Sequence, residues 1–144
     1  RTVAGAEGEW VLQGRLRGAG VGFRDERELR RTGMHRTPDC LLEVPVRIRG
    51  RVVNWIDSKA KFGDDAAMRK DYRDSISSYV SRFGRGMVIY WFGFLTDAPS
   101  PLLRDASVLV TSDLSPHDIT PLPSLPAPRP PLTESTTRPG SAQQ

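Results

Sequence analysis

Apolar residues recur with two different periods along residues 1–97, and the two periods predict helices and strands in turn. Residues 5–16 place Leu12 and Leu16 one helical turn apart. Residues 64–83 carry apolar side chains at intervals of four, four, three and four, which is again a helical spacing. Strand-length apolar segments occupy residues 21–23, 37–46, 51–60 and 87–94. The predicted order is helix, strand, hairpin, helix and strand, which indicates an α/β fold.

The two middle strands are predicted to pair with each other, because Gly50 is the only turn signal between them. A turn centred near Arg49 places Asp39 opposite Lys59 and one diagonal step from Asp57. Asp57 and Lys59 lie two residues apart on one strand and therefore share a face of the sheet. Diagonal neighbours lie about 7–8 Å apart, which is close enough for two carboxylates to share one divalent cation.

Two acids and a lysine at one strand end suit the hydrolysis of phosphodiester bonds. Paired carboxylates bind hard cations such as Mg²⁺, which also accept phosphate oxygens as ligands. The bound ion acidifies a water molecule and offsets the charge that builds on the phosphate. Lys59 would orient or deprotonate that water, or stabilise the phosphate directly, and the sequence leaves these roles open. The competing interpretation is a salt bridge between Lys59 and one of the acids.

A third acid is predicted on the first helix. Glu9, Leu12 and Leu16 follow positions i, i+3 and i+7, so Glu9 shares the helix face that packs on the sheet. A carboxylate on that face either reaches the metal as a third acid or lies solvated at its edge.

The remaining composition sets the limits of the fold. Of the 12 prolines, 10 follow Asp97, so residues 98–144 are predicted as a mostly disordered tail with an edge strand or docked segment within 105–111. Residues 1–97 form the predicted domain. The single cysteine, Cys40, excludes an intrachain disulfide, and no apolar run is long enough to span a membrane. Residues 1–97 hold 18 Lys and Arg against 13 Asp and Glu, a net charge of +5 that modestly favours a polyanionic partner such as nucleic acid, and the alternative is a solvated basic face without a ligand.

Several stretches of this sequence resemble the TPD family of PD-(D/E)XK nucleases. They are Thr37-Pro38-Asp39, residues 41–46 (Leu-Leu-Glu-Val-Pro-Val), 53–60 (Val-Asn-Trp-Ile-Asp-Ser-Lys-Ala), 62–64 (Phe-Gly-Asp), 78–79 (Ser-Tyr), 82–86 and 88–94. The resemblance implies a restriction-endonuclease-like αβββαβ core, with a mixed central sheet flanked by helices. It makes Asp39 and Asp57 the ligands of Mg²⁺, with Mn²⁺ as an alternative, and Lys59 the catalytic lysine. Glu9 matches the first-helix glutamate of the superfamily, and Glu26 is the competing candidate.

The function that this resemblance implies is magnesium-dependent hydrolysis of nucleic acid, with DNA favoured over RNA. It also implies a codanin-like protein partner and a nuclear location, with the cytoplasm as a second location. The alternative is a nuclease fold with a weak or inactive site that serves mainly to bind such a partner. Ser75 favours this alternative, because the family carries a glutamine at that position. Asp57 also departs from the glutamate that the family more often has.

Overall fold

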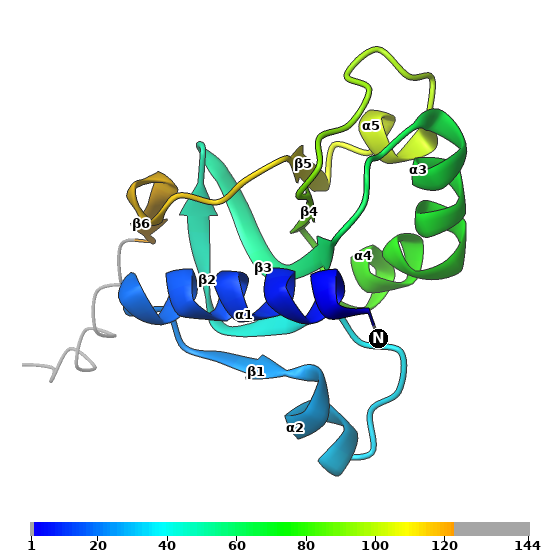
Figure 1. The fold of residues 1–144 in the computed structure, drawn as a ribbon. Coiled ribbons are helices and arrows are strands. Elements are labelled where there is room, and N and C mark those ends of the chain that lie inside the picture. Colours follow the sequence, from blue (N-terminus) through cyan, green and yellow to red (C-terminus); the bar gives the residue numbers. More distant parts are fainter. Residues whose placement is uncertain (1, 123–144) are drawn as a thin grey trace, which may run out of the picture.

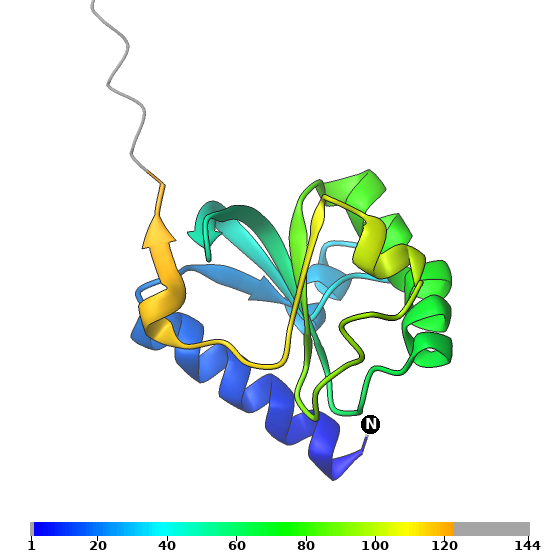
Figure 2. The same cartoon turned by 90° about the horizontal axis from the view of Figure 1, so that it is seen from above.

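The computed structural model describes residues 2–122, which form a mixed six-stranded sheet with helices on both faces (Figures 1 and 2). The strands are β1 (Phe23–Asp25), β2 (Cys40–Ile48), β3 (Arg51–Lys59), β4 (Gly86–Tyr90), β5 (Val108–Thr111) and β6 (Ile119–Pro121). Five of them follow the order β1-β2-β3-β4-β5, and β6 pairs with β2. The pairs β1–β2, β2–β3 and β2–β6 are antiparallel, whereas β3–β4 and β4–β5 are parallel. The predicted α/β class with a mixed, helix-flanked sheet is confirmed.

The helices divide between the two faces of this sheet. They are α1 (Val3–Gly18), α2 (Glu26–Arg31), α3 (Asp65–Asp71), α4 (Ser77–Phe83) and α5 (Pro101–Arg104), with a π-helical segment, Tyr72–Ile76, joining α3 to α4. In Figure 2, α1 crosses one side of the sheet, while α3, α4 and α5 lie on the other. The long helix predicted over residues 64–83 is therefore present, but its middle turn is widened. Among residues 2–122, no helix is both long and apolar enough to cross a bilayer.

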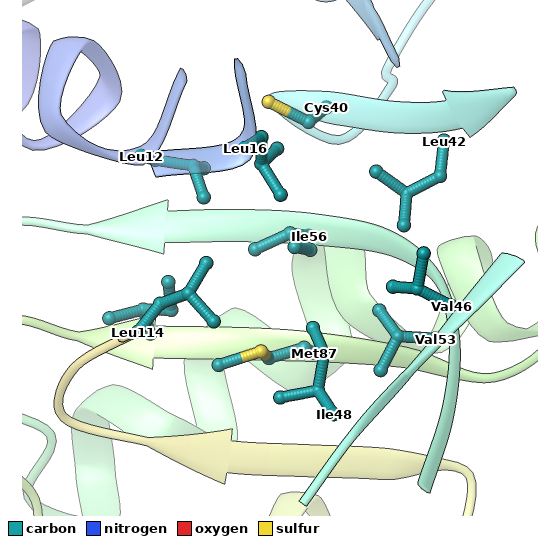
Figure 3. Close-up of a cluster of buried hydrophobic side chains, with 11 residues drawn as sticks. Leu12, Leu16, Cys40, Leu42, Val46, Ile48, Val53, Ile56, Met87 and Leu114 are labelled. Carbon is teal, nitrogen blue, oxygen red and sulfur yellow. The ribbon is translucent and has the colours of Figure 1, made fainter. Parts of the chain in front are cut away.

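Alternating residues of the central strands build one core on each face. Figure 3 shows the core under α1, where Leu12 and Leu16 meet Ile56 and Met87. The other core places Trp55 against the ring of Tyr79 in an edge-to-face contact, with 5.5 Å between the ring centroids. Successive residues of a strand point to opposite faces. As a result Asp57 and Lys59 share the face of Trp55, and Ser58 faces α1.

The hairpin register differs from the prediction. Arg49 and Gly50 both have positive φ, of 48° and 79°, as a two-residue hairpin turn requires, and Ile48 pairs with Arg51. The register then shifts between Leu41 and Val46, so that Cys40 pairs with Ile56. Asp39 consequently lies beside Asp57, and its predicted position opposite Lys59 is wrong.

An irregular, bulge-like stretch of β2 carries this shift, because residues 42–45 lie opposite the single residue Asn54 between the two paired segments. Pro45, inside the shifted stretch, has no N–H to donate to β3. Upstream of it, β2 also pairs along its other edge, where Leu42 faces Phe23 and the Glu43 N–H donates to the Gly22 carbonyl at 3.0 Å. Such bulges bend a strand and re-aim its side chains, and here the bulge carries Asp39 toward Asp57.

The sheet continues beyond residue 97. The edge strand predicted within 105–111 is present as β5, parallel to β4. Leu102 of α5 and Leu114 are fully buried, one in each core, and β6 adds a further pairing to β2. Leu102 and Leu114 thus anchor a proline-rich segment in the cores, although its composition predicts that it belongs to the tail. Residues 123–144, the remainder of that predicted tail, lie outside the described residues.

Replacing Gly86 by alanine should destabilise the domain strongly. A Cβ at this position would lie 1.9 Å from Cε2 of Trp55, and that indole is fully buried with its N–H donating to the Gly84 carbonyl at 2.8 Å. Overpacking of this kind costs on the order of 3 kcal/mol. Urea unfolding of Gly86→Ala should therefore show a large loss of unfolding free energy.

The matched control is the same substitution at Gly14 of α1. A Cβ there meets nothing within 4 Å, and alanine in a helix interior stabilises by about 0.5–1 kcal/mol relative to glycine. We expect the two substitutions to change the unfolding free energy in opposite directions. A Gly86→Ala protein as stable as the parent would show that Trp55 does not pack against β4 in this way.

Candidate active site

Asp39, Asp57 and Lys59 come together where β2 begins and β3 ends. The Asp39 backbone N–H donates to Oδ1 of Asp57 at 3.1 Å, and the Ser58 N–H donates to Oδ2 of Asp39 at 2.7 Å. The ammonium of Lys59 lies 3.0 Å from Oδ2 of Asp57, which is only 4% exposed. The structure thus joins the two acids through backbone hydrogen bonds and places one cation against them.

Helix α4 fixes the chain in front of Asp39. The hydroxyl of Tyr79 donates to the Thr37 carbonyl at 3.0 Å, and the guanidinium of Arg82 donates to the carbonyls of Arg36 and His35. The apolar spacing identifies Tyr79 as a core residue, which it is, but does not reveal its hydrogen bond. A purely hydrophobic ring would be sufficient on this apolar helix face. The hydroxyl of Tyr79 is therefore the sequence signal for a hydrogen bond. This anchoring sets the direction in which Asp39 enters the site.

The environment of Asp39 strongly favours its protonated form. Burial raises the pKa of Asp39 to about 9, the charges of Asp57 and Glu9 add to the effect, and the Ser58 N–H opposes it. Two close carboxylates and one ammonium leave negative charge uncompensated at this point. A divalent cation would compensate it.

Lys59 remains a cation in this environment. Burial alone lowers the pKa of Lys59, but the carboxylates of Asp57, Asp71 and Asp39 reverse the effect and raise it above the ordinary value. Of the roles that the sequence leaves open, hydrogen-bond donation and charge stabilisation fit this charged state.

Both candidates for the third acid lie near Asp39. Gly8 packs against Trp91 and Ser58, so α1 passes close to the strand ends, and the half-buried Glu9 contributes to the raised pKa of Asp39. Glu26 begins α2 and accepts a hydrogen bond from Arg30 at 2.6 Å. Electrostatic coupling to Asp39 favours Glu9, and its role as the third acid stays a prediction.

Two adjoining cavities meet at these acids. The first has a volume of about 840 Å³ and is lined by Ala6, Glu9, Trp10, Gln13, Asp25, Glu26, Arg27, Arg30 and Asp39. The second has a volume of about 760 Å³ and is lined by Glu26, Arg30, Arg36, Thr37, Asp39, Asp57, Ser58, Lys59, Arg73, Asp74, Ser75 and Tyr79. Asp39, Glu26 and Arg30 line both. A ligand that extends from one cavity into the other must therefore pass these residues.

The donor set suits a hard cation that shares its coordination with other oxygens. Within residues 2–122, no group of three or more His, Cys, Asp or Glu side chains is arranged to hold a metal. Mg²⁺ typically takes one or two protein carboxylates and completes its shell with waters and substrate phosphates. Asp39 and Asp57 fit that pattern, and the raised pKa of Asp39 marks the negative charge that such an ion would balance.

Without divalent ions, the stability of the domain should fall as pH rises from about 4 to about 9. The pKa of Asp39 is about 9 in the folded protein and about 4 in an unfolded chain. The folded state therefore binds more protons across this window, and its unfolding free energy decreases with pH until both states are deprotonated.

Asp39→Asn should remove this dependence, because an amide does not titrate. Urea unfolding in EDTA at several pH values checks the expectation, with the parent compared to the variant at each pH. Parallel stability curves for the two proteins would contradict it.

Comparison with known proteins places this chain among relatives of known name. CDAN1-interacting nuclease 1 of Danio rerio is 42% identical over 118 residues, which cover 82% of this chain and 38% of that protein. The protein of the same name from Homo sapiens is 43% identical over 93 residues, covering 65% and 33%. Uncharacterized protein L539 of Acanthamoeba polyphaga mimivirus is 28% identical over 117 residues, covering 73% and 41%.

The chain thus spans well under half the length of these relatives. No solved structure matches it, so the restriction-endonuclease-like assignment stays a prediction. Residues 1–113 match the family described as "Protein of unknown function TPD sequence-motif". The chain belongs to the TPD family.

Proposed function

We propose that this chain carries a metal-dependent nuclease site of the PD-(D/E)XK type, which hydrolyses phosphodiester bonds in nucleic acid and prefers DNA. The observation that carries the proposal is the group formed by buried Asp57 and half-buried Asp39 and Lys59, where two cavities meet at Asp39. A salt bridge alone needs one acid, whereas here a second acid, Asp39, lies beside the Asp57–Lys59 ion pair, and its pKa is raised to about 9. The two CDAN1-interacting relatives carry the word nuclease in their names, which supports the same conclusion.

The residues divide the work as follows. Asp39 and Asp57 hold the ion, Mg²⁺ or Mn²⁺, and Glu9 is the third acid beside them. When bound, the ion supplies an acidified water and offsets charge on the phosphate. Lys59 donates to the phosphate or to the attacking water from its charged state. Arg36 and Arg73, which line the second cavity, add positive charge for the nucleic-acid backbone.

A second candidate function is the binding of a codanin-like protein in the nucleus, with the nuclease site weak or inactive. Three exposed apolar side chains favour it: Phe62, Phe92 and Leu95. They lie on two loops that hydrogen bonds hold together, from Gly63 N–H to the Gly93 carbonyl and from Leu95 N–H to the Gly63 carbonyl, both at 2.9 Å. The names of the relatives include interaction with CDAN1. Both functions are compatible on one chain, because these loops do not line either cavity.

Lys59→Met should lower cleavage by about 10²-fold or more, because removal of an electrostatic or hydrogen-bonding group from a reaction centre has that scale. The assay uses single-stranded, duplex and branched DNA and RNA, each with Mg²⁺, Mn²⁺ or EDTA. Only the reactions with a divalent ion should show cleavage.

Lys61→Met is the matched control. Lys61 lies 2.9 Å from a carboxylate oxygen of Asp71, which is also buried, so each variant leaves a buried aspartate without its cation. Both should lose unfolding free energy, whereas only Lys59→Met should lose activity. Equal activity of the two variants, or no cleavage of any substrate by the parent, would favour the partner-binding function.

A further inference from the structure

We propose that the first cavity, lined by α1 and α2, is a nucleobase-binding site in which an unpaired base stacks on Trp10. The inference rests on the proposed nuclease function and names its substrate class: nucleic acid with single-stranded character on one side of the cleaved bond. The second cavity would then take the phosphates on the other side.

Trp10 is placed for stacking and not for packing. It is 76% exposed, and it lines the first cavity together with Ala6 and Gln13. At about 100° per residue, these three side chains occupy one side of α1, and Leu12 and Leu16 occupy the side buried on the sheet. Glu9 falls at the border between the two sides. The helix therefore presents a large aromatic face to the cavity that contains Asp39.

The other two tryptophans of the chain, both within the described residues, have structural contacts. Trp55 is fully buried between the sheet and Tyr79. Trp91 is half-buried, donates from Nε1 to the Ser58 hydroxyl at 2.6 Å and lies under the guanidinium of Arg15. Neither of them lines one of the two cavities, so Trp10 is the tryptophan on which a ligand in the first cavity can stack.

The charges of the two cavities differ, and the difference assigns a base to one and phosphates to the other. Four acids line the first cavity, Glu9, Asp25, Glu26 and Asp39, against two arginines, Arg27 and Arg30. One of these arginines already pairs with Glu26. Such a wall repels phosphate but accepts hydrogen bonds from the amino groups of bases, as carboxylates do from cytosine N4.

The second cavity lacks this excess of acids, because four basic side chains line it, Arg30, Arg36, Lys59 and Arg73, against four acids, Glu26, Asp39, Asp57 and Asp74. Within residues 2–122 the guanidinium of Arg36 has no hydrogen-bond or ion-pair partner, because the group that Arg82 contacts is the Arg36 carbonyl, whereas Lys59 pairs with Asp57 and Arg73 with Asp74. Phosphate contacts from arginine and lysine position a nucleic acid without reading its sequence. The strand would thus pass Asp39 with its backbone in the second cavity and its last base in the first.

A continuous duplex cannot satisfy this arrangement, because its bases are stacked on one another and paired. Taking a base out of the stack costs a few kcal/mol, and least where the base is already unpaired. Single strands, flaps and junctions present such bases at no cost. Stacking on an aromatic ring is also tolerant of sequence, since every base has a π face.

The test measures binding in the Lys59→Met chain with Ca²⁺, so that cleavage does not interfere. Three labelled ligands are compared by fluorescence anisotropy: a strand of about 15 thymidines, an abasic strand of the same length and charge, and a blunt duplex. The thymidine strand should bind about tenfold more tightly than either of the others. It should also quench tryptophan fluorescence, because Trp10 is the exposed indole.

Trp10→Ala in the same background should weaken binding of the thymidine strand about tenfold or more and abolish the quenching. Trp10→Phe should restore most of the affinity without the fluorescence signal. Phe92→Ala removes another exposed aromatic ring, which is 64% exposed and lines neither cavity, and should leave binding unchanged.

Equal binding of the thymidine and abasic strands, or unchanged affinity in Trp10→Ala, would overturn the inference. Equal binding of the blunt duplex would overturn it as well. The outcome is independent of catalysis: Trp10-dependent binding by a chain that cleaves nothing would support the base site and count against the nuclease proposal.

Discussion

The site depends on a pair of backbone hydrogen bonds that bind two carboxylates to each other's strand. Asp57 accepts from the N–H of Asp39, and Asp39 accepts from the N–H of Ser58. Each acid is therefore held by the chain segment that carries the other, and neither can move independently. Hydrogen bonds to a carboxylate favour its charged form, but they do not prevail at Asp39, whose pKa rises because of burial and the nearby charges. The two carboxylates are thus held in position by hydrogen bonds, although their negative charges repel each other.

The rest of the fold stabilises this arrangement from outside. The β2 bulge brings Asp39 across to Asp57, α4 anchors the preceding carbonyls through Tyr79 and Arg82, and Lys59 neutralises part of the charge. Two packed cores hold the strands on which these groups lie. Titratable groups whose pKa is shifted by burial and a specific charged neighbour, as for Asp39, tend to lie at functional sites. A cation that bound here would compete with the protonation that the raised pKa of Asp39 favours, and its affinity would then depend on pH.

Hydrophobic periodicity was sufficient to predict the main helices, the central hairpin and the edge strand β5, because each has a face that must be buried. It was not sufficient for the register, which depends on where β2 bulges. The sequence shows that Pro45 cannot donate a hydrogen bond to a neighbouring strand. It does not show on which side of Pro45 the register of β2 shifts, because β2 pairs with three other strands. The acids could be grouped because they lie at strand ends. The tail could not be read correctly from composition, since single residues such as Leu102 and Leu114 anchor it in the cores.

The widened turn between α3 and α4 bears on how the lysine is controlled. π-helical turns are rare and frequently lie at functional sites, and this one carries Arg73, Asp74 and Ser75 into the second cavity. Ser75 donates its hydroxyl to the Asp71 carbonyl at 3.1 Å, so it is engaged with its own helix and does not take the place of a longer amide side chain. The carboxylate of Asp71, held by Lys61 and the Tyr90 hydroxyl, instead contributes to the raised pKa of Lys59. The charged state of Lys59 thus depends on carboxylates from two elements, Asp57 of β3 and Asp71 of α3.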